Sequence, residues 1–237
     1  MRNLPTLANA VAELRERPVN YDEAQAPPFV VDGWHLDRRV IELGREAPGE
    51  PERGGLFETA GVLVNSCEFS DPRILRAAFR YSGELVGRDM LLEGRFLILR
   101  FLMGVRITAQ HDEVHDGPNG PERVIGWSYQ TLRGHLEQGR LTYELAKERA
   151  TGRVEFRIIA HSRRAPSRNA VLRLGFRVFG RRTQLRFYRH ALARLLRLLA
   201  DPPAPPQPGS DGIVRTPSGL EPGRLEALTL RFPHPGC

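Results

Sequence analysis

The sequence has few cysteines and no long apolar run. Cys67 and Cys237 are the two cysteines among 237 residues, which gives neither a disulfide framework nor the ligand spacing of a zinc site. No apolar stretch approaches the roughly 20 residues that a membrane-spanning helix needs, and the first residues lack the apolar core of a secretory signal. We therefore expect a cytoplasmic protein that holds no metal and no cofactor.

Lysine is nearly absent, and acidic residues are missing from one long stretch. The net charge is +7, and Lys147 is the single lysine among 35 basic residues. No aspartate or glutamate occurs between Glu155 and Asp201, a stretch that contains twelve arginines. Such a basic face could attract an anionic membrane surface weakly, although a solvated surface is the simpler interpretation. Because exposed stacking aromatics are missing from it, we expect no nucleic-acid binding.

Composition divides the chain into three parts. Residues 1–30 are polar and contain several prolines, which is typical of an N-terminal arm, and residues 31–200 carry the periodic apolar patterns of one folded domain. Residues 201–237 begin with a run of prolines that favours an extended tail.

The apolar periodicity predicts an α+β fold. A first strand is expected near 34–43, a helix over Leu56–Ser66, and a second short helix that starts at Ser70-Asp71-Pro72. Alternation then dominates from 88 to 163, as in an antiparallel meander. A long helix follows over 167–200, with an apolar stripe that must cover the sheet. We therefore predict an antiparallel sheet of about six to seven strands packed on a long C-terminal helix, with two short helices after the first strand.

Several motifs carry a family resemblance. The longest runs from Gly126 to Gly139 (Gly-Trp-Ser-Tyr-Gln-Thr-Leu-Arg-Gly-His-Leu-Glu-Gln-Gly), and shorter ones are Trp34-His35, Gly87–Phe96 and Phe156–Arg163. Together they resemble the domain-of-unknown-function family nineteen-ninety over roughly residues 33–199. That resemblance implies the helix-grip fold of the START-like, birch-pollen-allergen-like superfamily, in which a bent sheet wraps around the long helix and leaves a cavity.

Three aromatic residues and one histidine are candidates for such a cavity. Trp127 and Tyr129 share one face of their strand, and Tyr143 on the next strand could join them. These rings could line a pocket or simply form the core. His135 could act as an acid, a base or a ligand group, or it could hold the turn between Gly134 and Gly139 through backbone hydrogen bonds.

Other polar residues offer weaker signals. Arg157 lies among apolar strand residues and would favour an anionic group if it pointed inward. His161 precedes Ser162, but neighbouring strand residues point to opposite faces and form no catalytic pair. The segment His111–His115 has metal-like spacing beside a glycine-rich turn, where solvated polar residues are expected.

The sequence thus predicts a protein that binds a small hydrophobic or amphipathic molecule, with or without an anionic group. The predicted site residues are Trp127, Tyr129, His135, Tyr143, Arg157 and His161. One alternative is an enzyme of hydrolase, cyclase or isomerase type that acts on a hydrophobic substrate through a cavity histidine. A second alternative is a protein that associates with a membrane surface through its basic helix.

Overall fold

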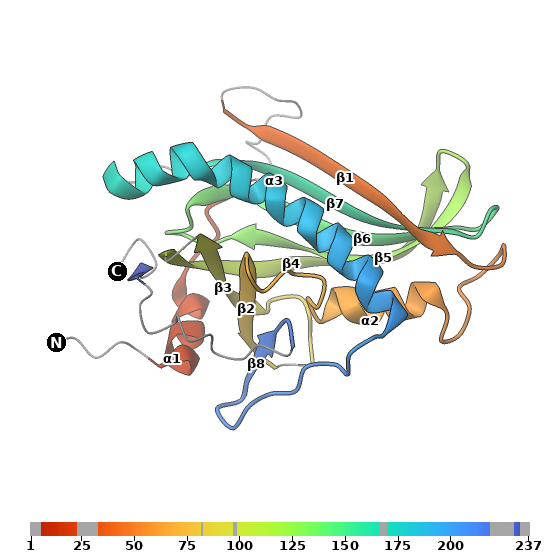
Figure 1. Cartoon of the computed structure of the whole chain (residues 1–237), viewed down its shortest axis with the longest axis horizontal. Helices are drawn as coiled ribbons and strands as arrows, with labels where there is room; N and C mark the ends of the chain where they lie inside the picture. Colours follow the sequence, from red (N-terminus) through yellow and green to blue (C-terminus); the bar gives the residue numbers. More distant parts are fainter. Residues whose placement is uncertain are drawn as a thin grey trace.

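The computed structural model describes residues 6–22, 33–81, 83–96, 99–165, 170–218 and 230–232. The elements follow the chain as helices α1, α2 and α3 and strands β1 to β9 (Figure 1), with a 3₁₀ turn over Glu13–Glu16 after α1. Their bounds are α1 Leu7–Ala12, β1 His35–Arg45, α2 Leu56–Asn65, β2 Leu75–Arg80, β3 Asp89–Phe96, β4 Leu99–Gly117, β5 Gly120–Thr131, β6 Glu137–Glu148, β7 Arg153–Arg164, α3 Ala170–Ala200, β8 Ile213–Thr216 and β9 Leu230–Phe232.

One antiparallel sheet dominates the molecule. Its strand order is β1-β7-β6-β5-β4-β3-β2-β8, and the short β9 pairs with β4 in parallel. Successive strands from β2 to β7 are neighbours, as the alternating pattern of a meander requires. Strand β7, the last strand of the predicted meander, returns beside β1, the strand that was predicted near 34–43.

Helix α3 crosses the concave face of this sheet (Figure 1). The apolar side of its second half, which includes Phe187, Ala191 and Leu195, is buried against that face. Burying an apolar stripe of this kind supplies most of the stability of a long helix. The predicted α+β helix-grip architecture is therefore confirmed. Among the helices of the described residues, none is long and apolar enough to cross a membrane.

Two short helices were predicted after the first strand, and the prediction of the second one is wrong. Leu56–Asn65 forms α2, but the segment from Ser70 makes a turn and continues as strand β2. Asp71 accepts a hydrogen bond from the backbone N–H of Arg73 at 2.9 Å, as a helix cap would. The backbone of β2 then hydrogen-bonds to β3 on one side and to β8 on the other. A helix at this position could not form these hydrogen bonds. The described sheet has nine strands, more than the six to seven expected.

The convex face of the sheet is partly covered by the chain's first residues. Val11 and Leu14 pack with Leu91, Leu132 and Ile213 in a second, smaller apolar cluster. Ile213 belongs to β8, so part of the segment predicted as a tail extends the sheet beside β2. Residues 202–208 have no regular secondary structure.

Candidate functional site

The six predicted site residues do not come together in the structure. Trp127, Tyr129 and Tyr143 lie on the concave face, on the same side as the core residues of their strands. Arg157 and His161 alternate with the core residues of β7, so they lie on the convex face. His135 lies in the turn between β5 and β6.

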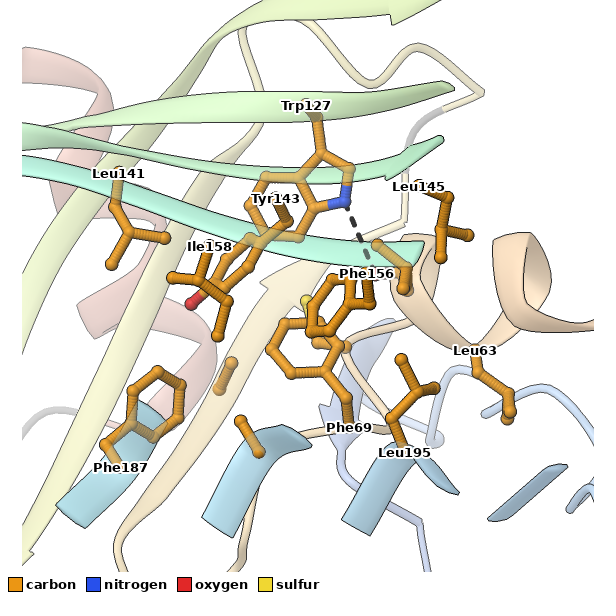
Figure 2. Close-up of a cluster of buried hydrophobic side chains, with 14 of the residues drawn as sticks. Leu63, Phe69, Trp127, Leu141, Tyr143, Leu145, Phe156, Ile158, Phe187 and Leu195 are labelled. Carbon is orange, nitrogen blue, oxygen red and sulfur yellow. Dashed lines mark hydrogen bonds between the residues drawn. The ribbon is translucent and has the colours of Figure 1, made fainter. Parts of the chain in front are cut away.

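The aromatic end of the concave face is tightly packed. Trp127 and Tyr143 are 1% and 2% exposed, and their ring centroids lie 4.8 Å apart in an edge-on arrangement. The Trp127 Nε1–H donates a hydrogen bond to the carbonyl of Val64 at 3.3 Å, shown by the dashed line in Figure 2. Phe69 and Leu195 reach the same cluster from the chain before β2 and from α3. We call Phe69, Trp127, Tyr143, Phe156 and Leu195 the aromatic end.

Gly126 lets β5 approach β6 closely at this point. A Cβ at this position would collide with the backbone carbonyl of Tyr143 on the neighbouring strand. Only glycine avoids that collision, and Trp127 follows immediately, so the glycine fixes where the indole enters the core. The first glycine of the family motif is therefore explained by close strand contact.

His135 holds the turn that precedes β6. The side chain is buried, and its Nδ1 accepts a hydrogen bond from the backbone N–H of Glu137 at 2.9 Å. Gly134 has a φ of 91°, which favours glycine because other residues are strained in that region. The turn therefore fixes the backbone of Glu137, the first residue of β6.

The two convex-face residues are engaged in contacts there. Arg157 binds Glu122 through two hydrogen bonds of 2.8 and 3.1 Å and reaches Glu155 at 3.0 Å. The His161 Nδ1 lies 3.1 Å from the hydroxyl of Tyr21, and its ring packs on Trp34 at a centroid distance of 4.6 Å. The contact between Tyr21 and His161 ties the N-terminal segment to the outside of the sheet.

A polar group of residues occupies the other end of the concave face, and the sequence interpretation missed it. We call it the polar cluster, and it brings four elements together. Its members are Asp37 of β1, Tyr129 of β5, Glu137 of β6, and Arg181, Gln184 and Tyr188 of α3.

The ion pair in the polar cluster is Arg181 with Asp37. The Arg181 Nη2 donates to Asp37 Oδ1 at 2.6 Å, and Nη1 donates to the second carboxylate oxygen and to Gln184 Oε1 at 2.7 Å. Asp37 is 5% exposed, so its charge needs this partner. The pair is neutral as a unit.

Glu137 has a weaker partner. Its Oε2 is 3.5 Å from the amide nitrogen of Gln184, which is long for a hydrogen bond. Burial raises the pKa of Glu137 to about 7, Arg181 opposes this, and the nearby Asp37 charge raises it further. Glu137 therefore changes its charge near neutral pH.

The Tyr188 hydroxyl is the unsatisfied group in the polar cluster. Tyr188 is 0% exposed, and its hydroxyl has no hydrogen-bond partner among the described residues. Burial raises the pKa of Tyr188 well above its ordinary range, and the charges of Glu137 and Asp37 raise it further. The hydroxyl thus remains a neutral donor for which no described residue supplies an acceptor.

The sequence did not single out Glu137 as a site residue. One signal did point to the polar cluster: Arg181 interrupts the apolar stripe of the long helix. A cation inside a buried stripe needs an anionic partner from elsewhere in the chain. The sequence did not reveal that the partner is Asp37.

The described residues outside the polar cluster hold no metal site of the kind that the His111–His115 spacing suggested. No group of three or more His, Cys, Asp or Glu side chains within the described ranges is arranged to hold a metal ion. The His111 Nε2 instead lies 2.9 Å from the Ser128 hydroxyl, which contacts Thr142 at 2.7 Å on the convex face. A separate surface groove of about 680 Å³ lies between α2, residues 83–86 and Pro205-Pro206.

Comparison with solved structures gives only distant likenesses. The crystal structure of Ara h 8.0201 is 9% identical, with a TM-score of 0.41, and the match covers 71% of this chain and 99% of that one. A putative uncharacterized protein from Rhizobium leguminosarum is 10% identical, with a TM-score of 0.37 over 70% of this chain and 96% of that one. TM-scores this low do not establish a shared function.

Comparison with sequence families identifies the family to which the chain belongs. No curated protein matches the sequence. Residues 16–194 match the family model described as Domain of unknown function (DUF1990), a range that contains the motifs of Gly87–Phe96 and Gly126–Gly139. The resemblance read from those motifs is confirmed, and the chain belongs to the DUF1990 family.

Proposed function

We propose that this protein binds a small hydrophobic or amphipathic molecule between its sheet and helix α3, with the polar part of the molecule at the polar cluster. The observation that carries the proposal is the Tyr188 hydroxyl, which is fully buried and has no partner within the part of the chain that the structure describes. Leaving such a group unpaired costs about 1–3 kcal/mol. A ligand with an acceptor atom would remove that cost on binding.

Partial exposure of two neighbouring side chains supports the same location. Tyr129 and Glu137 belong to the concave face, yet both remain partly exposed, whereas Trp127 is fully buried. Solvent therefore reaches the edge of the polar cluster at Tyr129 and Glu137, whereas Tyr188 inside the cluster and the aromatic end are buried. Met103 of β4 shares the concave side and is also partly exposed, which offers apolar contact to the body of a ligand.

An arginine on the convex face gives no support for an anionic ligand. Arg157 was the candidate for such a group, but it is satisfied by Glu122 and Glu155 away from α3. The arginine that does reach the polar cluster, Arg181, is already paired with Asp37. The polar end therefore offers hydrogen bonds rather than a free positive charge.

Calorimetric titration with 1-octanol and with the dye 1-anilinonaphthalene-8-sulfonate tests the proposal. We expect the unmodified protein to bind at least one of these probes. Tyr129→Trp should abolish binding, because the larger indole would occupy the place that the proposal gives to the ligand. Leu36→Trp is the matched control, since Leu36 is 51% exposed on a neighbouring part of the sheet. Absence of binding by the unmodified protein, or equal binding by a folded Tyr129→Trp variant, contradicts the proposal.

A second candidate function has one specific observation in its favour. Four arginines on the outer side of α3 are exposed, and they make no ion pair with any described residue: Arg182, Arg186, Arg189 and Arg197. Such a face could rest on an anionic membrane surface. Sedimentation with phosphatidylglycerol vesicles at low and high salt tests it, because screening at about 0.5 M salt should release the protein. No sedimentation at low salt eliminates this candidate.

A further inference from the structure

We infer that the polar cluster selects ligands by the charge of their polar group: it accepts a neutral hydrogen-bond acceptor at Tyr188, and it accepts a carboxylate only together with a proton on Glu137. This inference rests on the proposed binding function and names the ligand class that the site takes. Three observations carry it, and they concern the cation, the anion and the donor of the cluster.

The cation of the cluster is already committed. Both terminal nitrogens of Arg181 donate to the carboxylate of Asp37, and Nη1 also reaches Gln184. Arg39 also approaches the same carboxylate, at 3.9 Å from Asp37 Oδ1. Among the described residues, the charged groups that face the cluster are Asp37, Arg39, Glu137 and Arg181. Arg181, the cation that acts on both Tyr188 and Glu137, cannot neutralise an added carboxylate without giving up part of its pairing with Asp37. The Arg39 side chain is 45% exposed and makes only this long contact with the cluster.

The anion of the cluster opposes a charged ligand. Glu137 lies close enough to Tyr188, Tyr129 and Arg181 for its charge to act on all three. A ligand carboxylate at Tyr188 would therefore face a second carboxylate in a poorly solvated space. Two such groups cannot both be ionised at low cost, and one of them takes a proton. Since burial already raises the pKa of Glu137 to about 7, Glu137 is the group that takes it.

The donor of the cluster does not discriminate by charge. The Tyr188 hydroxyl stays protonated throughout the neutral range because burial raises its pKa. It can donate to the oxygen of a ketone, an ether or an alcohol at any such pH. A neutral ligand therefore needs no proton, and its affinity should hardly depend on the state of Glu137.

Calorimetry with octanoate and 2-octanone at pH 6 and pH 8 tests the inference. Octanoate is ionised at both pH values, and it would bind only to the fraction of protein with protonated Glu137. That fraction falls about tenfold between pH 6 and pH 8 for a group titrating near 7, so the affinity for octanoate should fall about tenfold. The affinity for 2-octanone should change less than about twofold. Titration in two buffers with different ionisation enthalpies should show proton uptake with octanoate alone.

Two variants separate the roles of the carboxylate and the hydroxyl. Glu137→Gln should bind octanoate equally well at both pH values and leave 2-octanone binding unchanged. Tyr188→Phe should weaken 2-octanone binding about fivefold to tenfold, the usual effect of losing one hydrogen bond. Glu144→Gln is the matched control, because Glu144 is on the same strand with its side chain on the opposite face.

The outcomes distinguish this inference from the function on which it rests. If both ligands bind and octanoate shows no pH dependence, or keeps it in Glu137→Gln, charge selection is refuted and the binding function stands. If neither ligand binds at either pH, both are refuted. A tenfold fall that disappears in Glu137→Gln and persists in Glu144→Gln supports the inference.

Discussion

The two ends of the concave face differ in how completely their polar atoms are satisfied. Tyr143 and Glu137 belong to the same strand and point to the same side, about 20 Å apart along β6. At the aromatic end, Trp127 donates to Val64, and the Tyr143 hydroxyl is hydrogen-bonded to Tyr129. At the polar cluster, Glu137 has one long contact and Tyr188 has none among the described residues.

This difference separates a packed core from the proposed binding site within one layer of side chains. The aromatic end follows the rules of a well-packed core, in which buried polar atoms are paired. The polar cluster breaks those rules at Glu137 of β6 and at Tyr188 of α3, the helix that covers it. A fold keeps such groups when the rest of the structure supports them, and they concentrate where a ligand or substrate is handled.

The largest effect is expected at the aromatic end. Trp127→Ala should lower the free energy of unfolding by about 3–5 kcal/mol, because it leaves a cavity where a fully buried indole had packed. Urea denaturation at pH 7 measures the loss. Tyr81→Ala is the control, since Tyr81 is 65% exposed and should change the same quantity by less than about 0.5 kcal/mol. A loss at Trp127 no greater than that of the control would mean that the aromatic end is loosely packed.

An effect of opposite sign is expected at the polar cluster. Glu137 has a pKa raised to about 7 in the folded protein, against 4.5 as its ordinary value. The unfolded chain therefore loses this proton first, and the folded state loses stability as the pH rises from about 4.5 to about 7. Glu137→Gln should remove that loss and raise the free energy of unfolding by about 1–3 kcal/mol at pH 8.

The pH profile of that variant is its own control. At pH 4 the side chain is largely protonated in both states, so Glu137→Gln should have little effect there. Thermal unfolding at pH 4 and pH 8 gives the comparison. A variant that is destabilised at pH 8 would show that the ionised carboxylate is well satisfied in the folded protein, contrary to its contacts.

Much of the fold could be predicted because periodicity is a local property. The alternation of Val154, Phe156, Ile158 and Ala160 marks β7, and each of these residues is buried in the core. The heptad-like spacing of the last helix likewise predicts α3. The segment after Ser70 was wrongly predicted as a helix because its apolar spacing suits one helical turn as well as a strand. Its pairing with β3 and β8 makes it a strand, and that pairing involves residues far away in the sequence.

The candidate site was harder to predict because it is assembled from distant segments. Asp37, Glu137 and Arg181 are separated by at least 44 residues in sequence. Asp37 and Glu137 look like ordinary surface charges when taken alone, and only Arg181 stands out, because it interrupts an apolar stripe. By contrast, the convex position of Arg157 could have been deduced from the sequence. Arg157 lies between the core residues Phe156 and Ile158, and neighbouring strand residues point to opposite faces. The aromatic residues of the family motif were conspicuous, yet Trp127 and Tyr143 serve the core.

The smallest effect, and the most direct comparison of the two ends, comes from removing one hydroxyl from each. Tyr143→Phe deletes a hydroxyl that is hydrogen-bonded to Tyr129, so it should cost about 1 kcal/mol. Tyr188→Phe deletes a hydroxyl without a partner among the described residues, so it should be neutral or slightly stabilising. Urea denaturation of both variants in ligand-free buffer measures the two changes. Because the rings and their burial are nearly unchanged, the difference between the variants isolates the hydrogen bond. If Tyr188→Phe costs as much as Tyr143→Phe, the Tyr188 hydroxyl already has an acceptor and is no longer a reason to place a ligand beside it.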